Sequence, residues 1–132
     1  MLKKLIVGLA LLAFGFIGGL HAQAPASAIK RTILQRADVP SGAAYEVVLG
    51  MAEVPAGALV GKHMHPGVEL GVLVEGEATM LIDGQPERTL KPGDSYQVAI
   101  GVAHDAKAGS AGAKVIAVYT VEKGKPLAVV VK

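Results

Sequence analysis

From residue 29 onward, short runs rich in Val, Ile and Leu alternate with glycine, proline and aspartate. Beyond the N-terminal segment, apolar residues nowhere recur at the three- to four-residue spacing of an amphipathic helix. Short β-branched runs between turn residues are typical of antiparallel strands, and roughly eight to ten such runs favour a sandwich or a closed barrel. The sequence therefore predicts an all-β domain.

The strands are expected where these apolar runs lie. They are 29–36, 45–54, 68–74, 78–82, 87–90, 96–98, 102–106, 114–122 and 127–131. Between 78–82 and 87–90 stands Asp83-Gly84, a pair suited to the positive φ angles of a type I′ turn, so we expect a tight hairpin there. Asp94, which follows a Pro-Gly pair, is expected to stabilise a turn.

The first 22 residues have the order of a signal peptide: two lysines, an almost unbroken apolar run and small residues at the end. We expect cleavage after Ala22, because cleavage after Ala24 would leave Pro25 just beyond the bond. An uncleaved membrane anchor is the alternative, but the apolar run is short for a span of roughly 20 residues and contains four glycines. The protein is therefore predicted to be exported, either periplasmic or secreted.

Behind the leader we expect a linker and N-terminal strand over 23–36 and a barrel domain over 37–132. The leader holds two lysines and no acid, so the remaining chain has 11 Lys or Arg against 11 Asp or Glu. No basic patch indicates nucleic-acid binding, and no membrane contact is expected after cleavage. Because the chain has no cysteine, its core must be stable without disulfides.

Three histidines and one glutamate are the candidate chemistry of this chain. His63 and His65 are two residues apart, so both rings would project from one face of a strand. His104 ends a distant apolar run, and Glu69 stands between Val and Leu in another. Two histidines can share a strand face by chance, and a lone histidine is often structural. A carboxylate in an apolar run is costly to bury without a partner, and a cation would supply one.

The spacing of these residues resembles the two sequence motifs of the cupin superfamily, in particular its small single-domain bacterial members. The resemblance covers roughly residues 45–119. The first motif corresponds to Gly57, five residues, His63-Met64-His65, three residues, Glu69, six residues and Gly76. The second corresponds to Gly93, five residues, Ala99-Ile100-Gly101, two residues and His104. The sequence departs from the family at Ala99, where proline is usual, and at Ala108, where asparagine is frequent.

The resemblance implies a double-stranded β-helix, or jelly-roll, cupin barrel with one divalent transition metal ion inside. Its ligands would be His63, His65, Glu69 and His104. Imidazoles with one carboxylate suit Fe, Mn, Zn, Ni or Cu, so the identity of the metal stays open.

Two functions remain open at this point. The first is a metal-dependent oxygenase, isomerase or lyase that acts on a small molecule, with a dioxygenase-like cupin as one form. The second is a non-catalytic metal- or ligand-binding module of the periplasm. Tyr96 is a candidate acid or hydrogen-bond donor, or else a tyrosine of the barrel wall. The strand at 29–36 either exchanges between two copies in a homodimer or remains the edge strand of a monomer.

Overall fold

The computed structural model describes residues 29–39 and 44–132. The predicted leader and its cleavage site lie outside these residues. The described chain contains eight strands and no helix, so none of it could cross a bilayer as a helix. The strands are β1 (Lys30–Asp38), β2 (Tyr45–Val54), β3 (His63–Met64), β4 (Gly67–Ile82), β5 (Arg88–Leu90), β6 (Ser95–Val98), β7 (His104–Glu122) and β8 (Val129–Val130).

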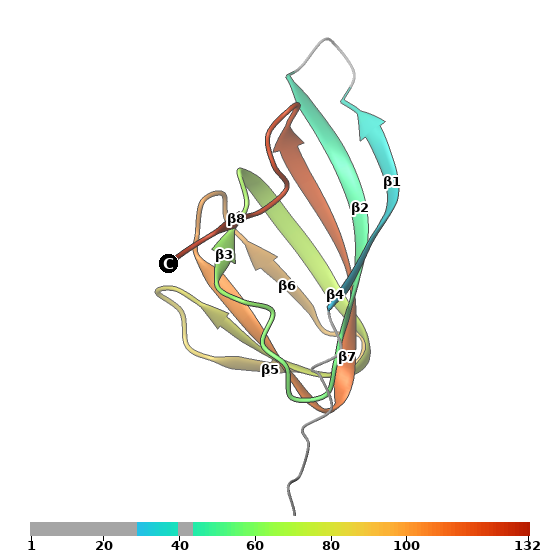
Figure 1. The fold of residues 1–132 in the computed structure, drawn as a ribbon, viewed down its shortest axis with the longest axis vertical. Helices are drawn as coiled ribbons and strands as arrows, with labels where there is room; N and C mark the ends of the chain where they lie inside the picture. The colour runs from blue at the N-terminus through green and yellow to red at the C-terminus, as the bar shows by residue number, and fades with distance from the viewer. Residues whose placement is uncertain (1–28, 40–43) are drawn as a thin grey trace, which may run out of the picture.

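The strands form two facing sheets that share the long strands β4 and β7 (Figure 1). In one sheet, β1 pairs with β2, β2 with the second half of β7, and β7 with the first half of β4, which also pairs with β6. In the other, β8 pairs with β3, and β3 with the first half of β7. That half of β7 pairs with the second half of β4, which also pairs with β5. This is the antiparallel jelly-roll arrangement, so the predicted all-β barrel is confirmed.

The two long strands pass from one sheet to the other at a pair of facing glycines. Gly76 in β4 and Gly112 in β7 have φ angles of 76° and 82°, values that L side chains rarely adopt. A Cβ atom at Gly76 would overlap the carbonyl oxygen of Gly112. The register of β4 against β7 also shifts between Gly76 and Ala78. Because both strands bend there, the runs expected at 68–74 and 78–82 belong to one continuous strand.

The hairpin at Asp83-Gly84 is wider than the tight one predicted. A backbone hydrogen bond from Gln85 to Ile82 closes a turn around this pair, and Gly84 has a φ of 80°. However, the pair of β4 and β5 nearest the turn is Met80 with Arg88, so the residues between them remain unpaired with each other. Pro86 interrupts the return strand because it has no N–H to donate.

The core lies between the two sheets and is aliphatic. Strand alternation turns every second residue inward, and the most completely buried large side chains are Leu73, Leu90, Val48, Val98 and Val121. Asp94 stabilises a turn at its edge, since its carboxylate accepts a 2.8 Å hydrogen bond from the amide of Lys91.

Candidate metal centre

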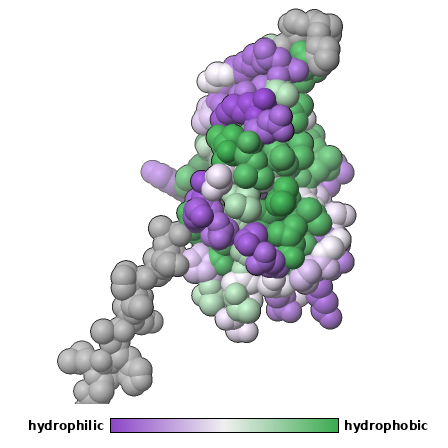
Figure 2. Space-filling view, turned by 90° about the vertical axis from the view of Figure 1, so that its right-hand side faces the viewer, coloured by the Kyte–Doolittle hydropathy of each residue, from purple (hydrophilic) through white to green (hydrophobic). Residues whose placement is uncertain are grey.

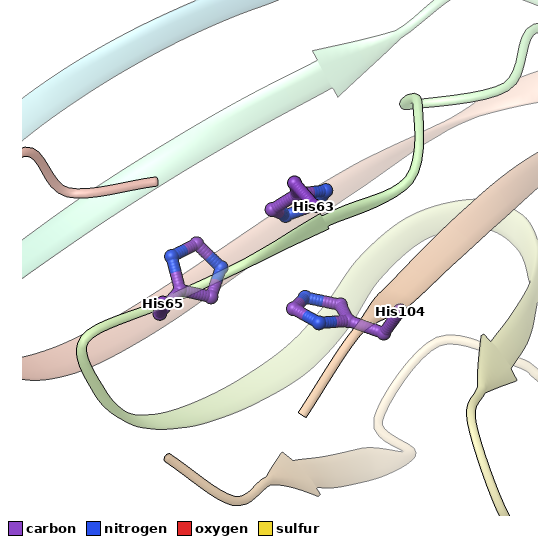
Figure 3. A group of neighbouring side chains, drawn as sticks. All are labelled: His63, His65 and His104. Carbon is purple, nitrogen blue, oxygen red and sulfur yellow. The ribbon is translucent and has the colours of Figure 1, made fainter. Parts of the chain in front are cut away.

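Three imidazoles from two distant parts of the chain meet inside the barrel. His63 belongs to β3, His65 follows that strand directly, and His104 begins β7. The antiparallel register places His63 opposite His104. The ring centroids lie 4.3 to 5.1 Å apart, and each ring offers one nitrogen within 4.8 Å of the others. Figure 3 shows the three rings gathered around one point.

Backbone carbonyls orient all three rings. Nδ1 of His63 lies 2.7 Å from the carbonyl oxygen of Gly61, that of His65 lies 2.6 Å from Leu127, and that of His104 lies 3.0 Å from Val102. A carbonyl oxygen only accepts, so each Nδ1 carries the proton and donates it. Each Nε2 of a neutral ring is then left with a lone pair. This is how metal-binding histidines are commonly held in proteins.

The buried carboxylate of Glu69 completes the cluster. Its Oε2 lies 3.0 Å from Nε2 of His65 and 3.2 Å from Nε2 of His104. Even so, this oxygen and Nε2 of His65 are buried without a hydrogen-bond partner among the described residues. With all three rings neutral, the imidazoles and the carboxylate direct electron pairs at one another, an arrangement that a proton or a cation between them relieves. A divalent cation at this point would satisfy all of them, so the residues present fit a metal ion.

The electrostatics of the cluster favour an ionised glutamate. Burial raises the pKa of Glu69, but the imidazoles of His104 and His65 and the Tyr96 hydroxyl outweigh burial and lower that pKa. Burial lowers the pKa of His63 and leaves that ring neutral. Burial also acts to lower the pKa of His104, yet the Glu69 carboxylate beside it raises the pKa overall. The carboxylate thus keeps its charge, as a metal ligand must.

Tyr96 points into the barrel and donates a 2.7 Å hydrogen bond to Oε1 of Glu69. Its partner in the register is Gly71, where a Cβ atom would overlap the Tyr96 ring. The missing side chain at Gly71 lets the ring lie across β4 and reach the carboxylate. Burial, together with the charge of Glu69, raises the pKa of Tyr96, so its hydroxyl stays protonated and orients Glu69. Whether Tyr96 also acts in catalysis stays a prediction.

Sequence reasoning assigned no role to Tyr119, yet its ring lies 4.8 Å from that of His65. Burial and the charge of Glu69 raise its pKa. The alternation of 114–122 could have placed Tyr119 on the same strand face as Val115 and Ala117, but the sequence does not say which face is internal. In the structure, Tyr119 pairs with Glu69 across the sheet.

The cluster lies in a cavity of about 560 Å³. Its walls are mainly aliphatic and small, with Ile33, Val60 and Val115 beside several alanines. The charged side chains along it are Arg31, Lys62 and Glu69. A cavity of this size accommodates a small molecule next to the imidazoles.

The fold and the site define a class of protein: jelly-roll barrels with imidazoles turned into an internal pocket. Residues 50–121 match the cupin domain family, and the chain therefore belongs to the cupin family. The suspected membership is confirmed. No curated protein is similar enough in sequence to be counted as a match.

Several solved structures share the fold. The DMSP lyase DddQ of Ruegeria pomeroyi is 25% identical with a TM-score of 0.59, and the match covers 64% of this chain and 42% of the lyase. KdgF of a Halomonas species is 24% identical with a TM-score of 0.59, covering 73% and 81% of the two chains. A cupin superfamily protein of Desulfitobacterium hafniense is 21% identical with a TM-score of 0.61, covering 76% and 84%. The chain thus spans less than half of the length of DddQ.

Proposed function

We propose that this protein binds one divalent transition metal ion through His63, His65, Glu69 and His104 and acts as a metal-dependent enzyme on a small molecule. One observation carries the proposal: three oriented imidazoles converge in the cavity, and beside two of them lies a buried carboxylate oxygen with no hydrogen-bond partner among the described residues. A metal bound there would polarise a substrate oxygen or activate dioxygen. Fe, Mn, Zn, Ni and Cu all suit these ligands.

A double substitution tests the metal site. We expect His63→Ala/His104→Ala to abolish metal retention, because it removes two of the three imidazoles. Elemental analysis after purification measures this, and circular dichroism checks that the barrel still folds. Lys107→Ala is the matched control, since this exposed β7 residue lies three positions from His104. Equal metal in the double variant and the wild type would refute the site.

The reaction class is proposed from the similar structures. They include a DMSP lyase and an oxalate oxidase that is 21% identical and matched over 46% of its length. We expect the metal-loaded protein to turn over a small substrate by lyase, isomerase or oxygenase chemistry. Oxygen uptake and product analysis against DMSP, oxalate, diketones, phenols and sugars would reveal it.

A non-catalytic binding module is the second candidate. Within the described cavity, the hydroxyl of Tyr96 is already engaged with Glu69, so it is not a free acid–base group beside the imidazoles. Tight metal retention without turnover of any compound in the panel would favour this function over catalysis.

Export is also part of the proposal and is supported by the composition of residues 1–22. Mass spectrometry of protein from the native host should find a chain that begins at Gln23. An intact Met1 in the membrane fraction would favour the uncleaved anchor instead.

A further inference from the structure

Arg31 differs from the other charged side chains of β1 and from the other cation of the cavity, because they form ion pairs and it forms none with a described residue. The other charged side chains of β1 have partners: Lys30 lies 3.1 Å from Glu53, Arg36 lies 2.7 Å from Glu46, and Asp38 lies 2.9 Å from Lys123. Arg31 forms no ion pair with any residue that the structure describes. Lys62, the second cation of the cavity, lies 2.9 Å from Asp83. Arg31 is thus the cavity cation that the described chain leaves without a counter-charge.

Arg31 lies on β1 in one sheet, and its side chain reaches the segment before β3 of the other sheet. It pairs with Ala52 of β2, and both residues line the cavity. Its guanidinium extends to the segment before β3, where one nitrogen lies 3.5 Å from the carbonyl oxygen of Val60. That long contact uses one of the five N–H donors of a guanidinium. Arg31 is exposed, so its remaining donors are open to a ligand at the rim of the cavity that it lines.

Arg31 is also within electrostatic range of the cluster. Its positive charge acts to lower the pKa of Tyr119, whose ring contacts His65. A divalent metal held by neutral imidazoles and one carboxylate would carry one net positive charge. Together with Arg31, the cavity would then hold two positive centres separated by aliphatic walls.

We propose that Arg31 binds a carboxylate of the substrate, whose aliphatic part lies against the cavity wall between Arg31 and the metal. This inference rests on the proposed function and specifies its substrate class as small organic acids. A guanidinium presents two parallel N–H groups that match the two oxygens of a carboxylate. Ile33, two residues along the same strand, supplies adjacent apolar surface.

Titration of the protein with pentanoate and its neutral amide, pentanamide, by calorimetry tests this inference. We expect the wild type to bind pentanoate and to bind pentanamide at least about tenfold more weakly. Arg31→Gln should lower the affinity for pentanoate by about 10- to 100-fold, the range for a lost charge-assisted hydrogen-bonded pair. Arg31→Lys keeps the charge without the paired N–H groups, so its affinity for pentanoate should lie between those of the wild type and Arg31→Gln.

Arg36→Gln is the matched control. Arg36 lies on the same strand and pairs with Glu46, so its substitution should leave both affinities unchanged. The proposal is overturned by any of three results: no binding of pentanoate to the wild type, equal binding of acid and amide, or unchanged binding of pentanoate by Arg31→Gln. The last result would also arise if the carboxylate bound the metal alone.

Metal content, measured on the same samples, separates this inference from the proposed function. Arg31→Gln should retain as much metal as the wild type, because Arg31 does not touch the imidazoles. A wild type that retains no metal contradicts the proposed function, and titration of that protein still decides the role of Arg31. Binding of pentanoate that depends on Arg31 supports the inference, and binding that is absent or independent of Arg31 overturns it.

Discussion

At the scale of single residues, the ionised carboxylate of Glu69 serves both the metal site and the fold. Its Oε2 faces Nε2 of His65, and its Oε1 accepts a hydrogen bond from Tyr96. The pKa of Glu69 is lowered in the folded protein, so its ionised form contributes stability at neutral pH. Glu69 is therefore expected to contribute both to metal binding and to the stability of the metal-free protein.

Glu69→Gln tests both contributions. The pKa of Glu69 is lowered in the folded protein, so removing its charge should cost the metal-free variant about 1 kcal/mol at neutral pH, or roughly 4 °C in Tm. The affinity for metal should fall at least about tenfold, because an anionic ligand is lost. Thermal unfolding with and without metal measures both. Glu75→Gln, at an exposed β4 position paired with Lys114, is the control and should leave metal affinity unchanged.

The affinity for metal should also depend on pH in a defined direction. A proton on an imidazole competes with the metal. The Glu69 carboxylate raises the pKa of His104, which strengthens the competition of protons at this ring. We expect the affinity for metal to decrease as pH falls through roughly 6, the range in which imidazoles take up protons. Equilibrium dialysis at a series of pH values would show this, and full occupancy at roughly pH 4 would contradict it.

At the scale of elements, the bend of β4 and β7 holds the two halves of the site together. Glu69 lies before the bend in β4, and His104 lies on the half of β7 that pairs with β4 beyond it. The facing glycines at this bend set the angle between the sheets, so they act on the site without touching it.

Gly76→Ala should destabilise the barrel by more than its backbone strain alone. A left-handed φ costs a residue with a side chain about 1–3 kcal/mol, and here the new Cβ would also overlap the backbone of Gly112. Gly84→Ala isolates the first effect, because Gly84 has a φ of 80° and open space around it. Urea unfolding of both variants measures the difference. Equal losses of stability would show that the two strands do not approach closely at the bend.

At the scale of the whole molecule, the outer face of the larger sheet is apolar. Leu49 of β2, Val118 of β7 and Leu70 of β4 are neighbours in the register, and Leu70 is 52% exposed. Figure 2 shows apolar side chains gathered in the middle of the face on the β1 and β2 side, with hydrophilic ones toward its margins. Contiguous exposed apolar surface of this kind is typical of interfaces.

The sequence leaves a homodimer and a monomer open, and we propose that two copies pack through this face. Its apolar centre carries no charge, so two copies could meet without like-charge repulsion. Sedimentation should find a dimer for the wild type and a monomer for Leu70→Lys. Leu59→Lys, at a 53% exposed site that lies outside this row, is the control; a monomeric wild type would refute the dimer.

The sequence alone determined the fold class and the candidate ligands. Turn residues at short intervals and the two-residue spacing of His63 and His65 are local properties, and strand alternation turns that spacing into a shared face. The resemblance to the cupin motifs added Glu69 and His104. The position of strand ends was less determined. Runs separated by Gly76 appeared as two strands, because a glycine that bends a strand and one that ends it look alike in sequence.

Only the tertiary structure decided which groups meet. Tyr96 reaches Glu69 because Gly71 leaves space for its ring, and Tyr119 and Arg31 join the cavity through the register of β7 and β1. The sequence does not specify these side-chain contacts, because contacts between distant segments depend on which strands pair and in which register. Local periodicity determines which face a side chain shares with its neighbours, whereas packing of the whole sheet determines whether that face is inside.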